Sequence, residues 1–214
     1  MKILVKFLIL IAILSSCSKN ENTKKEIGKF RKISYDLRYN YFDSIAKNIK
    51  PNLNYQYWQY ATFYQQYGGY IPDKYTVLAQ GGDTLQNKSI NRKIDPMKTI
   101  GIFQGGHPSY RCNYAVVVQN NKIHYINSEE EFRTFLGTID NLEEAVMFAR
   151  TYGYSVDSDI RGSQYREIDN GYELHLAKYH EFPQRKESMN VIITKNGFLK
   201  ASSLGIYCKE RQCN

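Results

Sequence analysis

The residues of this chain that could carry chemistry are mainly its cysteines and histidines, four of each. These residue types often supply nucleophiles, bases and metal ligands. Cys112 could act as a nucleophile with His124, His175 or His180 as its base, because such a pair needs only proximity in space. Any chain with a spare cysteine and several histidines permits the same pairing, so the pattern gives a hydrolase weak support.

No spacing in the sequence indicates a metal or cofactor site. A zinc site needs four ligands, and neither His107 with Cys112 nor Cys208 with Cys213 matches a compact ligand spacing. Segment 157–162 has the acidic start of a calcium loop but an arginine at a ligand position. The chain also lacks a nucleophile elbow, a zinc-protease helix and a phosphate-binding loop. We therefore expect no metal, no cofactor and no catalytic residues of a known motif.

An aromatic segment, residues 55–67, is the main candidate for binding. Tyrosine and tryptophan rings suit protein partners, and exposed rings also stack on sugars. The spacing of four tyrosines in this segment predicts a helix with one aromatic face. Because one face of a helix must be buried, we expect most of these rings in the core. An exposed subset, Tyr55, Trp58 and Tyr70, would form the binding surface.

The segment before the aromatic rings also predicts a helix. Residues 27–49 carry apolar side chains at spacings of three and four, as in an amphipathic helix that Pro51 would end. These side chains are Ile27, Phe30, Ile33, Leu37, Tyr41, Ile45 and Ile49. The sequence therefore places helices before Gly68.

After Cys112 the pattern changes to strands joined by tight turns. Asn120-Asn121, Asp169-Asn170-Gly171 and Asn196-Gly197 each separate two apolar segments. Asparagine and glycine tolerate the positive φ that short hairpin turns require. We therefore predict three β-hairpins in a mostly antiparallel sheet.

Two short helices are expected between the first and second hairpins. Ser128 and Glu131 have the spacing of a capping box, and Gly137 would end the helix that they open. Asp140 or Asn141 would cap the second helix. Together the elements predict an α+β fold, with N-terminal helices followed by a mostly antiparallel sheet and the two central helices packed on one of its faces.

The N-terminus has the order of a secretion signal: a positive region, an apolar region and small residues. Its apolar run is about half the ~20 residues that a membrane-spanning helix needs. The tetrapeptide Leu14-Ser15-Ser16-Cys17 resembles the lipobox of bacterial lipoproteins. This resemblance implies that residues 1–16 are a signal peptide removed before Cys17. It also implies that Cys17 is lipidated, with a diacylglyceryl group and a further acyl chain such as palmitate.

The same resemblance implies a location. Ser18 is similar to the residue that follows the cysteine in outer-membrane lipoproteins, so we expect a bacterial cell-envelope protein held in the outer membrane by its lipid. Residues 17–26 would be the lipidated cysteine and a flexible tether that extends at most about 30 Å. Residues 27–214 have a length that suits a single globular domain.

The charge of the chain bears on its partners. Loss of the two signal-peptide lysines, Lys2 and Lys6, lowers the formal net charge from +8 to +6. An exported chain rarely meets nucleic acid, so we expect none as a partner, and anionic lipid or cell-wall polymer fits better. Basic residues cluster after the anchor, where they would either contact an anionic membrane or keep the tether solvated.

Lipidation of Cys17 leaves Cys112, Cys208 and Cys213 as disulfide candidates, and three thiols cannot all pair within the chain. A bridge between Cys208 and Cys213 would stabilise the fold by about 2 kcal/mol, and a bridge from Cys112 by nearly 5 kcal/mol. The sequence does not choose between them.

These observations favour a lipid-anchored envelope protein whose domain is a non-catalytic binding or accessory module for a protein or a glycan. The alternative is an envelope hydrolase that acts on peptide or glycan. A hydrolase requires a cleft with titratable residues of perturbed pKa, whereas a binding module requires an exposed patch.

Overall fold

The computed structural model of the chain describes residues 29–35, 41–66, 69–70, 76–83, 94–95, 101–105 and 110–209. The predicted signal peptide, the lipobox, the tether and Cys213 lie outside the described residues. Among the described residues, 49% are in strands and 17% in helices. The strands form two antiparallel sheets, and the helices are short. The predicted α+β fold, with N-terminal helices and one helix-covered sheet, is therefore wrong.

The C-terminal half, together with the short N-terminal strand β1, forms the first sheet, here called sheet A. Its strand order is β1-β9-β10-β11-β12, and β8 pairs with β10 beside the end of β9. Its strands are β1 (Arg31–Lys32), β8 (Tyr154–Ser155), β9 (Ser163–Ile168), β10 (Gly171–His180), β11 (Arg185–Thr194) and β12 (Leu199–Lys209).

The second sheet, sheet B, is built on two long central strands, β2 and β6. Strands β3 and β4 pair with β2, and β5 and β7 pair with β6. Its strands are β2 (Tyr57–Gln66), β3 (Gly69–Tyr70), β4 (Thr76–Gly82), β5 (Phe103–Gly105), β6 (Tyr110–Gln119) and β7 (Lys122–Ile126).

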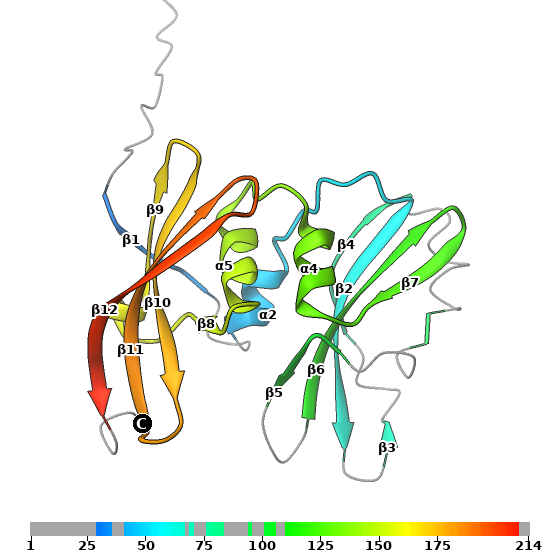
Figure 1. Cartoon of the computed structure of the whole chain (residues 1–214). Coiled ribbons are helices and arrows are strands. Elements are labelled where there is room, and N and C mark those ends of the chain that lie inside the picture. The colour runs from blue at the N-terminus through cyan, green and yellow to red at the C-terminus, as the bar shows by residue number, and fades with distance from the viewer. Residues whose placement is uncertain are drawn as a thin grey trace, which may run out of the picture.

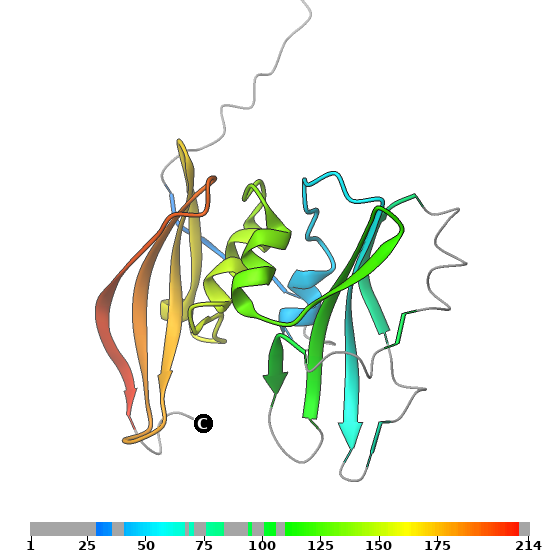
Figure 2. The same ribbon diagram turned by 45° about the vertical axis from the view of Figure 1, so that its right-hand side comes forward.

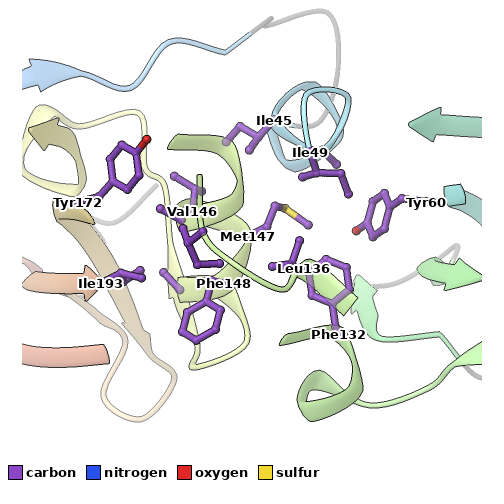
Figure 3. Close-up of a cluster of buried hydrophobic side chains, with 14 of the residues drawn as sticks. Ile45, Ile49, Tyr60, Phe132, Leu136, Val146, Met147, Phe148, Tyr172 and Ile193 are labelled. Carbon is purple, nitrogen blue, oxygen red and sulfur yellow. The ribbon is translucent and has the colours of Figure 1, made fainter. Parts of the chain in front are cut away.

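A layer of helices separates the two sheets (Figures 1 and 2). It consists of α2 (Tyr41–Ala46), α4 (Glu129–Leu136) and α5 (Leu142–Arg150). One hydrophobic cluster runs through all three layers, from Tyr172 and Ile193 of sheet A through Met147 and Phe132 to Tyr60 of sheet B (Figure 3). Among the described residues, no helix is long and apolar enough to cross a membrane.

The helix predicted for residues 27–49 is mostly absent from its described part. Residues 31–32 form strand β1, and the backbone N–H of Ile33 donates to the carbonyl of Ser163 at 2.8 Å. Only α2 is helical, and it contributes Ile45 to the core. Ile33, Ile45 and Ile49 are buried as expected, but pairing with a strand distant in sequence determines the backbone of the first part.

The aromatic segment is strand β2 and not a helix. Trp58 and Tyr60 point to the helix layer, while Tyr57 and Ala61 lie in a second cluster on the opposite face of sheet B. Aromatic residues favour strands, where they pack against neighbouring strands. Because both faces of β2 are buried, apolar and polar side chains do not alternate along it as they do in a half-exposed strand. Its aromatic residues also match the spacing of a helix.

The predicted tight turns are confirmed. Asn120 and Asn121, with φ of 50° and 59°, join β6 to β7. Residues 169–170 join β9 to β10, and residues 195–198 join β11 to β12. Local turn chemistry was sufficient to locate these hairpins.

The caps of the two central helices are also confirmed. Ser128 and Glu131 form a complete capping box at the start of α4, and Gly137 ends that helix with φ of 71°. Asn141 caps α5 by accepting from the backbone N–H of Glu144.

Glu144 joins the helix layer to the segment that leads into sheet B. Its side chain is fully buried, and its two carboxylate oxygens accept from the backbone N–H groups of Lys50, at 2.8 Å, and Asp140, at 2.9 Å. Burial raises the pKa of this carboxyl, and these hydrogen bonds partly offset the rise. Nearby, the Asn52 carboxamide donates to Asp140 and accepts from the N–H of Thr138. The loop before β2 is thus fixed to the start of α5.

We predict that Glu144→Gln lowers the free energy of unfolding by about 1–3 kcal/mol, because the new amide NH₂ must face one of the two buried backbone donors. Urea denaturation measures the change. Glu143→Gln removes the same charge from the same helix turn and should change stability by less than ~0.5 kcal/mol. Equal losses of unfolding free energy in the two variants would show that the buried hydrogen bonds of Glu144 do not stabilise the fold.

Candidate functional site

The candidate site lies on the face of sheet A that points away from the helices. Along β10, Leu174 and Leu176 point into the core, so the alternate residues Glu173 and His175 point outward. These outward side chains are half-buried, which leaves them accessible to a ligand.

A row of polar side chains crosses this outer face. The strand register pairs Lys32 with Gln164, Gln164 with His175, His175 with Asn190 and Asn190 with Ser202. Directly paired residues project to the same side of a sheet. With strands ~4.8 Å apart, five hydrogen-bonding side chains span about 19 Å. We call these five residues the polar row.

His175 at the centre of the polar row is held in its neutral form. Its ring stacks on Phe30, with 4.1 Å between the ring centroids. Burial lowers the pKa of His175; the carboxylate of Glu173 opposes this shift, and the guanidinium of Arg166 adds to it. Arg166 and Glu173 are themselves paired at 2.6 Å. A neutral imidazole offers one donor and one acceptor, both of which a hydroxyl group can use.

Asn190, the next residue of the polar row, has a buried carboxamide oxygen with no hydrogen-bond partner in the described part of the chain. Most buried polar atoms in proteins are paired, so an unpaired one needs an explanation. This oxygen has less than 1 Å² of accessible surface, so a ligand hydroxyl reaches it only after the carboxamide rotates outward.

Next to the polar row, the outer face of sheet A contains a hollow with a volume of about 320 Å³. The hollow is lined by Arg161, Gln164, His175 and Ser188, and by the β12 segment 204–207. It combines hydrogen-bonding groups with the exposed apolar side chains of this segment, Leu204 and Ile206.

Tyr207 closes one side of the hollow because β12 is irregular there. The β11–β12 register shifts between Lys186 and Glu187, which leaves Tyr207 without a direct partner. Such bulges re-aim side chains. The Tyr207 hydroxyl donates to Asp157 Oδ2 at 2.6 Å, across a space kept open by Gly162, where a Cβ would lie 2.9 Å from that hydroxyl.

The carboxylate of Asp157 is stabilised in its charged form. Burial by itself would raise the pKa of Asp157. Hydrogen bonds from the Tyr207 hydroxyl and the Ser158 backbone, and the charge of Lys186 at 3.4 Å, instead hold this pKa below its usual range. Burial and the nearby carboxylate raise the pKa of Tyr207, so its phenol stays protonated. This group of residues therefore acts as a rigid support and not as an acid–base pair.

The guanidinium of Arg161, which also lines the hollow, is held in an ion pair. Arg161 donates from two nitrogens to Asp159, at 2.9 and 2.6 Å, and holds the pKa of that carboxyl at about 2. Its guanidinium lies 4.9 Å from the centroid of the Tyr207 ring, and its backbone carbonyl accepts from Ser188. The hollow thus offers shape and hydrogen bonds rather than a reactive group.

The aromatic residues proposed from the sequence lie elsewhere. Trp58 is 7% exposed and packs edge-on against Phe135, and Tyr55 is half-buried against the same ring. Tyr70 is in strand β3, paired with Gln65, and its side chain lies outside the described residues. Trp58 and Tyr55 therefore contribute to the core and offer no free ring.

The structure does not assemble the cysteine–histidine pair considered from the sequence. Cys112 is free and buried on the outer face of sheet B, where burial raises its pKa. His124 pairs with Val117, which belongs to the opposite face. His175 and His180 belong to sheet A. None of these three imidazoles is placed to activate the thiol.

A serine, a carboxylate and a histidine do meet at the inner side of sheet A, but in an order unsuited to catalysis. His180 Nε2 lies 2.8 Å from Glu187, and the Ser203 hydroxyl donates to the other oxygen of that carboxylate. In a catalytic triad the histidine lies between the hydroxyl and the acid. Here the carboxylate lies between the hydroxyl and the histidine, so no imidazole contacts the hydroxyl.

Of the disulfide candidates, Cys208 is disulfide-bonded and Cys112 is a free thiol. A bridge between these two is therefore excluded, and Cys213 lies outside the described residues. Within the described ranges, no group of three or more His, Cys, Asp or Glu residues could hold a metal ion.

Comparison with known proteins gives no guide to this site. No protein-family model matches the chain, and no significant match is found among the curated proteins or the solved structures.

The polar row was not predicted from the sequence, although a usable signal was present. The hairpin turns at 169–170 and 195–198 fix the register of β9 with β10 and of β11 with β12. These registers place Gln164 opposite His175 and Asn190 opposite Ser202, but the β10–β11 register that joins the two pairs comes from the turn at residues 181–184, which was not predicted.

We predict that Tyr207→Phe lowers the free energy of unfolding at pH 7 by about 1–3 kcal/mol, because it removes a hydrogen bond to a charged carboxylate. Tyr152→Phe, whose ring is 45% exposed, is the control and should change little.

The unfolding free energy lost in Tyr207→Phe should become smaller as the pH falls. Because folding lowers the pKa of Asp157, its stabilising effect is present above the unfolded value of about 3.9 and is lost as the pH falls through the folded value. The stabilities of wild type and Tyr207→Phe should therefore converge on acidification. A constant difference between pH 7 and pH 2 would contradict this role for Asp157.

Proposed function

We propose that this protein is a lipid-anchored component of the bacterial cell envelope whose folded domain binds a glycan, without catalysis, through the polar row and the hollow of sheet A. The observation that carries the proposal is the register of Gln164, His175, Asn190 and Ser202 across four adjacent strands.

The state of the titratable groups favours binding over catalysis. Around the hollow, Asp157 is paired with Tyr207, Arg161 with Asp159, and Arg166 with Glu173. A hydrolase needs a nucleophile or water beside a base. Here the charged groups hold one another in place, and the hydroxyl of Ser188, which lines the hollow with His175, donates to the Arg161 carbonyl and not to the imidazole.

The chemistry of the polar row favours a glycan over a protein partner. Four of its five members are uncharged in the folded state, and they offer amide, imidazole and hydroxyl groups that exchange hydrogen bonds with sugar hydroxyls. The centre of a protein–protein interface is usually apolar and rich in aromatic residues. Here Phe30 stacks on the central His175 and Tyr207 lines the adjoining hollow, while the row itself consists of hydrogen-bonding side chains.

The lipid anchor rests on the lipobox resemblance of residues 14–17. It would hold the domain at a membrane surface, where envelope glycans are concentrated, and the basic residues before β1 would lie next to that surface. Two or three acyl chains suffice for stable anchoring.

We predict that Gln164→Ala and Asn190→Ala each weaken binding to isolated cell-wall glycan by about five- to tenfold, the value of one hydrogen bond. Co-sedimentation with purified wall material measures the binding. Gln119→Ala, at an exposed end of β6, is the matched control. Asn190→Ala should leave the stability unchanged, because its buried oxygen has no partner to lose. Unaltered binding by both variants would refute the proposed site.

We further predict that Cys17→Ala abolishes acylation and membrane association. Intact-mass analysis and membrane fractionation of the native protein beside the variant measure both effects. Membrane retention of the unmodified variant would show that the lipobox does not anchor the chain.

A further inference from the structure

A second feature, at the β10–β11 turn, is independent of the polar row. The turn, residues 181–184, and the strand ends beside it enclose a hollow of about 450 Å³. Arg185 lines this hollow, and its Nε is buried with no hydrogen-bond partner in the described part of the chain. We call this hollow the hairpin cup.

Two carboxylates of the protein near the hairpin cup, those of Glu187 and Asp157, are already engaged. Glu187 accepts from Ser203 and contacts His180, and Asp157 accepts from Tyr207 and pairs with Lys186. This pairing explains why Arg185 has no acidic partner in its own sheet. The Nε of Arg185 is therefore left without an internal hydrogen-bond acceptor among the described residues.

The charges that line the cup favour an anion. Two cationic side chains line it, Arg185 and Lys186, and Lys186 also lies 3.4 Å from Asp157. Glu181, in the turn, is the one acidic side chain among the residues that line the cup. Positive charge therefore exceeds negative charge here.

The chemistry of arginine narrows the class of anion. Its planar guanidinium presents two parallel N–H donors, which match two oxygens of a phosphate group, while a nearby lysine adds a point charge. The ring of Phe182, 95% exposed, stands at the rim of the cup and can cover an apolar or sugar portion attached to that group.

We propose that the hairpin cup is a phosphate-binding site in which Arg185 holds the phosphate group of an envelope molecule. The phosphate could belong to a lipid headgroup or to a wall polymer, and the chemistry at Arg185 is the same for both. The site is separate from the polar row, so its failure would leave the proposed glycan binding untouched.

The first test titrates the mature chain with inorganic phosphate at constant ionic strength and follows the backbone amides of residues 179–186 by NMR. We expect saturable shifts in wild type, at least tenfold weaker binding in Arg185→Gln and intermediate binding in Arg185→Lys, which keeps the charge but loses the planar fork. Lys209→Gln removes one positive charge at the same end and should bind nearly as wild type.

Stability provides a second readout. Because the buried Nε of Arg185 has no hydrogen bond to lose within the described part of the chain, Arg185→Gln should unfold at the wild-type temperature or above it, and phosphate should raise the unfolding midpoint of the wild type alone. Absence of saturable shifts, or equal weakening by Arg185→Gln and Lys209→Gln, would overturn the proposal and leave only a diffuse charge effect.

Vesicles then distinguish the two sources of phosphate. Arg185-dependent co-sedimentation of a non-lipidated Cys17→Ala chain with phosphatidylglycerol vesicles, but not with phosphatidylcholine vesicles, would assign an anionic lipid headgroup. Binding of inorganic phosphate without vesicle binding would assign a phosphate of a wall polymer.

Discussion

The burial of helix α5 on all its sides is the constraint on which the rest of the structure depends. Every residue from Glu144 to Ala149 is buried, so one sheet alone could not cover this helix. Two sheets are needed, and the helix layer lies between them (Figure 2). Glu144 makes this arrangement feasible at the polar end of the helix, because its buried carboxylate satisfies the backbone N–H groups of Lys50 and Asp140.

The layered arrangement limits where a ligand can bind. The inner faces of both sheets are used to cover the helices, and the outer face of sheet B buries a second cluster that includes Tyr114 and Ile94. The outer face of sheet A remains as a broad face of half-buried polar side chains. The charged groups near its centre, such as Arg166 and Glu173, are paired, and Lys32 lies exposed at its edge, so the centre is largely uncharged. Such a face suits recognition of an uncharged, hydroxyl-rich ligand better than it suits chemical catalysis.

Local sequence signals predicted local structure well and long-range pairing poorly. Asn120-Asn121 and the Ser128–Glu131 capping box were located correctly because their geometry depends on adjacent residues alone. Strand β2 was mistaken for a helix because Tyr57 and Trp58 face two different buried clusters, which hides the alternation of a strand. The polar row was missed because its members are brought together by strand register, and the bulge that positions Tyr207 has no marker in the sequence.

The most direct test of glycan binding at sheet A is an NMR titration of the protein with a soluble fragment of cell-wall glycan, in which the side-chain amide signals of Gln164 and Asn190 are observed. We expect saturable shifts in these two amides and in the backbone of β9, β10 and β11, with Gln119 on sheet B unchanged. Shifts confined to sheet B, or none at saturating glycan, would contradict the assignment of the outer face of sheet A as the binding surface.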